Sequence, residues 1–332
     1  RGPSPDQSIF SDPPRPPFFV RPPHSMNMAD FDGEISSDEL ASEDDDRREW
    51  LDDIRSKLEA DDEWLKRLFI EKDEEYKPVD GDWARDGMAV GKNTRLQLLS
   101  IRTSPPTNVE MVQFFSGAAS NTSIINLIFQ GCDLYKGFLL SSLLPMFDNN
   151  PNLQYMSVIN CMDGDSVDML AFVLTRFNTL KRFEYKENNP NLMLREEKIL
   201  TTLAGHTQLT CLDLSFNRIG GKGMDAVAAL LTRPNSMLET IILVCSHLED
   251  VGLCALTDGL AALSEKGDGK KMLKKLDLRN NSDISPAAWK YFVATLHHTT
   301  IETLSLASNS IDSSVIERLA TEITSHELSL KS

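Results

Sequence analysis

The chain has 332 residues, a formal net charge of −16 and a hydrophobic content of 41%. This length allows two ordinary domains, and the apolar content is sufficient for a packed core. The negative charge argues against sequence-independent nucleic-acid binding and against attachment to anionic membranes, because both need lysine and arginine opposite phosphates.

The first 47 residues are rich in proline and then in acidic side chains, with few apolar residues among the acidic ones. Such a composition cannot bury enough apolar surface to fold, so we expect residues 1–47 to form a disordered tail. Ser36 and Ser42 precede acidic residues and are candidate phosphorylation sites, where a phosphate would make the tail still more negative.

Residues 48–93 are predicted to form a helical N-terminal cap followed by a degenerate repeat. Residues 47–76 show helical spacing of apolar side chains, which are Trp50, Ile54, Leu58, Trp64, Leu65, Leu68 and Phe69. Residues 82–90 resemble the helical half of a repeat. We expect the helix to cover the apolar end of the first full repeat, and the alternative is a helix that binds a partner.

From position 94 to position 332 a leucine pattern recurs at regular steps of roughly 28 residues. Its clearest copies, which begin at Leu209 and Ile301, read L-x-x-L-x-L-x-x-N-x-I. The fourth positions of the copies are Leu99, Leu127, Met156, Phe183, Leu212, Ile241, Leu276 and Leu304. One longer step contains the polar run 264–271, which predicts a loop insertion. Such regular steps predict about eight units of one strand and one helix that share a continuous core.

The ninth position of each copy follows the strand directly. It holds Cys132, Cys161, Asn188, Asn217, Ser246, Asn281 and Asn309. A buried asparagine there can bond backbone groups that would otherwise lack a partner, so the recurrence in register predicts a structural ladder along the stack. The alternative is that these residues are ordinary turn formers.

The pattern resembles the ribonuclease-inhibitor-like leucine-rich repeat family over roughly residues 94–326. The length of the repeat, with Asn or Cys at the ninth position and room for a full helix, carries this resemblance. It implies an α/β fold, a right-handed solenoid or horseshoe with parallel strands on the concave face and helices on the convex face.

The chemistry-bearing residues do not form a recognisable catalytic or metal-binding motif. The five cysteines include no C-x-x-C pair, so we expect reduced thiols without a disulfide framework. No stretch reaches the ~18 consecutive apolar residues of a membrane span. We expect no catalytic residue, no metal and no cofactor, and a location in the cytoplasm, with the nucleus as the alternative.

Function must therefore depend on a surface. The fifth and seventh positions of each strand should face the concave side, where apolar and aromatic residues beside charges favour protein binding. The candidate partner-binding residues are Tyr155, Ile159, Lys186, Asp213, Phe216, Ile242, Val244 and Arg279. The sequence thus predicts a non-enzymatic scaffold, a monomer that binds another protein and neither nucleic acid nor membrane.

The sequence alone leaves two alternative functions open. One is a GTPase-activating protein, because the Ran GTPase activators share this type of repeat. The other is the substrate-recognition subunit of a ubiquitin ligase, which would need an F-box-like helical region. An assay of GTP hydrolysis would distinguish the first from a binding module.

Overall fold

The computed structural model describes residues 52–71, 82–102, 108–132, 134–162, 164–187, 196–234, 236–265 and 273–325. The expected disordered tail, both candidate phosphorylation sites and Asn188 lie outside these described residues.

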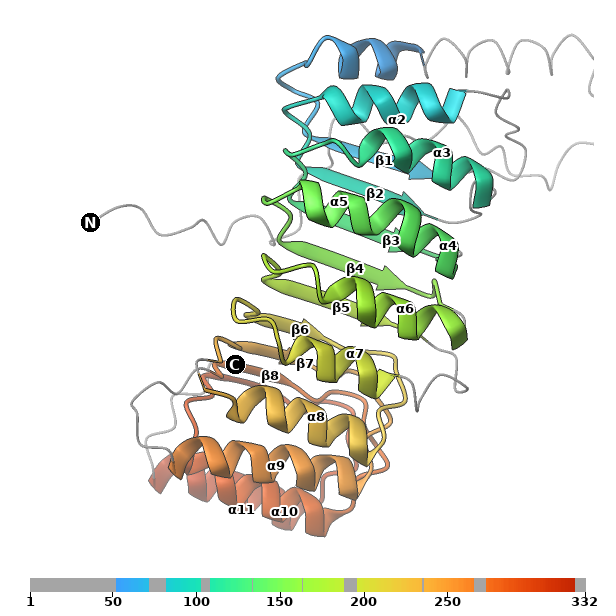
Figure 1. The fold of residues 1–332 in the computed structure, drawn as a ribbon. Coiled ribbons are helices and arrows are strands. Elements are labelled where there is room, and N and C mark those ends of the chain that lie inside the picture. The colour runs from blue at the N-terminus through green and yellow to red at the C-terminus, as the bar shows by residue number, and fades with distance from the viewer. Residues whose placement is uncertain are drawn as a thin grey trace, which may run out of the picture.

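The described residues form one sheet with a layer of helices on one side of it (Figure 1). The strands are β1 (Arg67–Glu71), β2 (Leu98–Arg102), β3 (Asn126–Gln130), β4 (Tyr155–Ile159), β5 (Arg182–Lys186), β6 (Cys211–Asp213), β7 (Thr240–Ile242), β8 (Lys275–Asp277) and β9 (Thr303–Ser305). The helices are α2 (Asp82–Lys92), α3 (Asn108–Ala118), α4 (Lys136–Phe138), α5 (Leu144–Asn149), α6 (Gly164–Leu174), α7 (Glu196–Leu203), α8 (Gly221–Thr232), α9 (Asp250–Glu265), α10 (Pro286–Thr295) and α11 (Ser313–Ser325). A π-helical turn (Leu139–Leu143) joins α4 to α5, and a 3₁₀ turn (Leu296–His298) follows α10.

All nine strands of this sheet are parallel, and their order in space equals their order in the chain. Side chains alternate between the faces of a strand, so the leucines at the fourth and sixth positions all turn toward the helices. Leu212, Leu276 and Leu278 are fully buried there. The predicted α/β solenoid is confirmed, with an open sheet and one continuous core.

The N-terminal part differs from the prediction of helix through residues 47–76. A helix covers residues 52–59, but β1 then pairs in register with β2. Leu65 and Leu68 are buried and Ile70 packs against the core, whereas Trp64 is 75% exposed. Leu65, Leu68 and Ile70 thus occupy the first, fourth and sixth positions of an additional repeat. The spacing of Trp64 and Leu68 resembled a helical face, but pairing with the neighbouring strand decides the conformation.

Two neighbouring helices, α2 and α3, touch backbone to backbone. A Cβ atom added at Gly87 would lie 1.9 Å from the carbonyl oxygen of Phe114, and one at Gly117 would lie 2.4 Å from the amide nitrogen of Met88. Only glycine permits this approach, so these positions set the spacing between the first repeats.

Candidate functional site

The face of the sheet turned away from the helices is the concave face, and its side chains stand in columns. Parallel pairing in strict register places Ser157 beside Glu184, and Glu184 beside Asp213. Ile242 and then Asp277 continue this column. Fifth-position residues far apart in sequence are therefore direct neighbours.

Near the middle of this face lies a hydrogen-bonded group of side chains, the central polar cluster. The cluster consists of Tyr155, Arg182, Glu184, Lys186 and Asp213. The Tyr155 hydroxyl and the Lys186 ammonium both donate to the Glu184 carboxylate. Lys186 Nζ also lies 3.1 Å from Asp213 Oδ2. The Arg182 guanidinium lies 5.2 Å from the centroid of the Tyr155 ring, within the range of a cation–π contact.

The electrostatics of the cluster fix its charge states. Burial raises the pKa of Glu184, but hydrogen bonds from Lys186 and Tyr155 outweigh it and hold this pKa below its ordinary value. Burial lowers the pKa of Lys186, yet Glu184 and Asp213 together raise it. Burial and the Glu184 charge raise the pKa of Tyr155, so the hydroxyl remains a donor at neutral pH. The cluster is therefore a rigid set of oriented charges.

The remaining predicted partner-binding residues surround the cluster. Ile159, at the end of β4, and Ile242 and Val244, at and after the end of β7, are partly exposed. Arg279 is exposed and its guanidinium bonds the buried Asp277, with the closest contact at 2.7 Å. Apolar groups thus lie beside fixed polar groups, and protein interfaces contain both kinds.

Phe216 lies at the rim of this face, in the turn that follows β6. Its φ is 62° and its side chain is 46% exposed. The same left-handed conformation recurs at the eighth position of other repeats, in Gly131, Asn160, Cys245, Asn280 and Ser308. Glycine and asparagine tolerate it, whereas a bulky side chain costs of order 1 kcal/mol or more. An exposed phenylalanine in this conformation is unfavourable for stability.

The ninth-position residues bond the backbone of adjacent repeats. Asn217 Nδ2 donates to the carbonyl oxygens of Tyr185 (2.7 Å) and Leu214 (2.8 Å), and its Oδ1 accepts from the amide of Glu187 (2.7 Å). Asn281 and Asn309 make corresponding bonds one repeat apart. Ser246 Oγ bonds the Leu214 carbonyl, and Cys132 and Cys161 are buried free thiols at this level.

A second row of buried polar side chains lies three positions before the first apolar residue of several copies, and it was not predicted from the sequence. Asn93, Asn121 and Asn150 are buried there, and Asn121 Nδ2 donates to the carbonyls of Val90 and Asn93, each at 2.7 Å. His206 takes this position later, with Nε2 2.9 Å from the Leu174 carbonyl oxygen. The recurrence of asparagine in step with the leucine pattern was the available signal.

Comparison with protein-family models matches a model described as Leucine Rich repeat to residues 205–228. The matched residues hold strand β6, the Asn217 turn and the first turns of α8, within a nine-strand parallel sheet. The matched segment and the nine-strand parallel sheet together support a leucine-rich repeat fold for this chain. Comparison with the curated proteins found no match.

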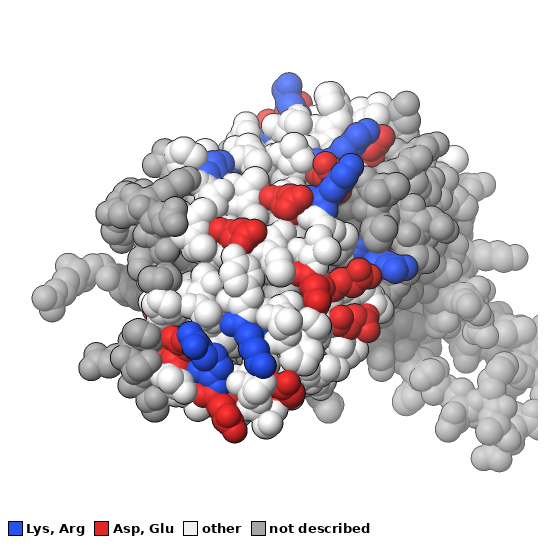
Figure 2. Space-filling view, turned by 90° about the horizontal axis from the view of Figure 1, so that it is seen from below, with Lys and Arg blue, Asp and Glu red and all other residues white. Residues whose placement is uncertain are grey.

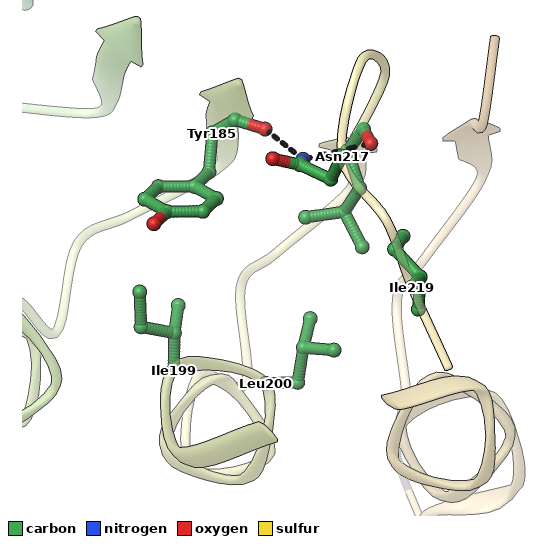
Figure 3. Close-up of a pocket in the computed structure, with 6 residues that line it drawn as sticks. Tyr185, Ile199, Leu200, Asn217 and Ile219 are labelled. Carbon is green, nitrogen blue, oxygen red and sulfur yellow. Dashed lines mark hydrogen bonds between the residues drawn. The ribbon is translucent and has the colours of Figure 1, made fainter. Parts of the chain in front are cut away.

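A small cavity lies under the sheet (Figure 3). Ile199 and Leu200 of α7 close it from below, and Tyr185, Asn217 and Ile219 line it on the strand side. Leu214 completes the lining. It has room for about one water molecule. A small-molecule site of the usual kind is far larger, so this cavity belongs to the core.

Other kinds of site find no support in the described residues. No group of three or more histidine, cysteine or acidic side chains among them is arranged around a metal position. None of their helices is both long and apolar enough to cross a membrane. Figure 2 views the molecule from below, past α10 and α11, where acidic and basic side chains are dispersed among uncharged ones.

Proposed function

We propose that this leucine-rich repeat protein is a non-enzymatic interaction module whose concave face binds another protein. The central polar cluster carries this proposal. Tyr155, Glu184 and Lys186 are already locked together by hydrogen bonds, so their side chains lose little entropy when a partner binds. The partly exposed Ile159 and Ile242 beside them supply apolar area.

Phe216 supports the proposal independently. Aromatic residues are common among the few side chains that dominate binding energy. The left-handed backbone at Phe216 holds its half-exposed ring at the rim, close in sequence to Asp213 of the cluster. Backbone strain of the kind seen at Phe216 is concentrated at functional sites of proteins.

Several finer statements belong to the same proposal. The repeats are of the ribonuclease-inhibitor-like type, the protein acts without catalysis or cofactor, and it binds its partner as a monomer in the cytoplasm or the nucleus. The partner is a protein rather than nucleic acid or membrane, in keeping with the net charge of −16.

The decisive experiment replaces Ile159, Phe216 and Ile242 together by serine in the full chain. We expect the triple variant to lose partner capture from a lysate while its thermal midpoint changes little, because all three side chains are partly or half exposed. Partner capture that persists with the triple variant would refute the concave assignment.

A matched control changes exposed apolar residues on the helix layer. Val109, Phe172 and Ile316 are 64%, 52% and 56% exposed. Their triple replacement by serine should leave capture unchanged. If the protein stimulated GTP hydrolysis by small GTPases, the GTPase-activator alternative would be favoured instead. No described residue specifically supports that alternative.

A further inference from the structure

The third, fifth and seventh strand positions carry a charge balance opposite in sign to that of the chain as a whole. The third, fifth and seventh positions of the nine strand units hold six basic residues, Arg67, Arg102, Arg182, Lys186, Lys275 and Arg279. The same positions hold four acidic residues, Glu71, Glu184, Asp213 and Asp277. This row of positions thus has more cations than anions, in a chain whose net charge is −16.

Three of the four acidic residues on this face are buried and pair with Lys186 and Arg279 of the same face. Glu184, Asp213 and Asp277 are 8%, 5% and 4% exposed, and each accepts hydrogen bonds from side chains of the same face. Arg67 and Lys275, by contrast, are exposed. Two exposed cations, one on β1 and one on β8, are therefore available to an acidic segment that crosses the face.

The chain itself contains a segment of the complementary charge. Residues 34–46, which lie outside the described residues, contain no basic residue and seven acidic ones: Glu34, Asp38, Glu39, Glu43, Asp44, Asp45 and Asp46. Thirteen extended residues span about 45 Å. Nine strands at the usual spacing are about 38 Å wide, so the lengths match.

The attachment point of this segment allows the contact. Residue 52 begins a helix of the helix layer, in which Arg55 bonds Asp86 of α2 at 2.6 Å. Residues 47–51 then supply a connection of about 17 Å to the edge of the sheet. Tethering in the same chain gives an effective concentration in the millimolar range, which makes even weak exposed ion pairs sufficient.

We propose that the acidic segment 34–46 docks across the concave face of its own chain and competes there with the protein partner. This inference rests on the proposed function, since it adds a regulator to the same face. Docking would make partner binding depend on ionic strength and on the acidic tail.

The test uses a fluorescent peptide of residues 34–46 and fluorescence anisotropy at low salt. The receptor is the full chain in which the seven acidic residues of the segment are changed to Asn or Gln, so that the face is open. We expect saturable binding to this receptor and about tenfold weaker apparent binding to the unmodified chain, whose own segment competes. A peptide with the same seven replacements should not bind.

Two receptor variants locate the contact. Lys275→Gln, at an exposed position, and Arg102→Gln should together weaken peptide binding about tenfold. Lys222→Gln with Lys290→Gln, on helices α8 and α10, is the matched control and should change nothing. Circular dichroism melting confirms that each variant is folded.

Absence of peptide binding to the open receptor would overturn the inference, as would binding that the Arg102 and Lys275 changes leave intact. The outcome is separable from that of the proposed function. Peptide binding without capture of any partner would refute the partner proposal alone, and partner capture without peptide binding would refute the docked segment alone.

Discussion

Asn217→Ala gives a quantitative test of the ninth-position ladder. The side chain is 2% exposed and makes three hydrogen bonds to backbone groups. The Leu214 carbonyl would retain a bond from Ser246 Oγ, at 3.2 Å. The Glu187 amide and the Tyr185 carbonyl would lose their Asn217 partner. Loss of these two buried hydrogen bonds, at about 1–2 kcal/mol each, predicts a loss of about 3 kcal/mol in the free energy of unfolding.

The matched control for this prediction is Asn309→Ala. Asn309 makes bonds of the same kind, with Leu278 O, Leu306 O and the Asn281 amide, at 2.7 to 2.9 Å. It is only partly buried, so water can replace the lost bonds, and we expect a loss of about 1 kcal/mol or less. Urea unfolding at equal m-values measures both. Equal losses for the two variants would refute the reasoning, as would a loss for Asn217→Ala no larger than that of one ordinary exposed hydrogen bond, about 0.5 kcal/mol.

Three further predictions concern pH and packing. Burial lowers the pKa of His206 from its ordinary value of 6.5, so the unfolded state binds more protons than the native state. The free energy of unfolding should therefore fall as pH drops below about 6.5. His206→Asn should reduce this pH dependence, measured by urea unfolding at pH 7.5 and 5.5. Burial raises the pKa of Glu187 above its ordinary 4.5, so the native state retains the proton and stability should fall as pH rises above 4.5. Glu187→Gln should therefore raise the thermal midpoint at pH 7.5 more than at pH 4.5. Gly87→Ala should destabilise by about 1–3 kcal/mol in urea unfolding because its Cβ would meet backbone at 1.9 Å. Gly205→Ala, whose nearest contact is 3.2 Å, should cost clearly less than Gly87→Ala.

The candidate site was only partly visible in the sequence. Strand alternation predicted that Ile159, Lys186 and Ile242 would share one face, because the leucine pattern fixes which residues turn inward. It could not show that Tyr155 and Lys186 both bond Glu184, because that depends on the distance between two neighbouring strands. Arg182 was missed for the same reason.

The backbone conformation at Phe216 was likewise beyond sequence interpretation. Phenylalanine seldom adopts a positive φ, so its residue type gives no hint of one. Only the repetition of the turn, in which Asn160 and Asn280 adopt the same conformation, imposes it.

The repeat length and the inward leucines by themselves determined the parallel solenoid, since a strand–helix unit with one apolar face can bury it only against a copy of itself. The start of the stack was decided by tertiary structure. Trp64 and Leu68 fit a helix locally, but pairing with β2 satisfies the backbone of residues 67–71 and buries Leu68. Local spacing is ambiguous for such short apolar runs, and contact with the next unit removes the ambiguity.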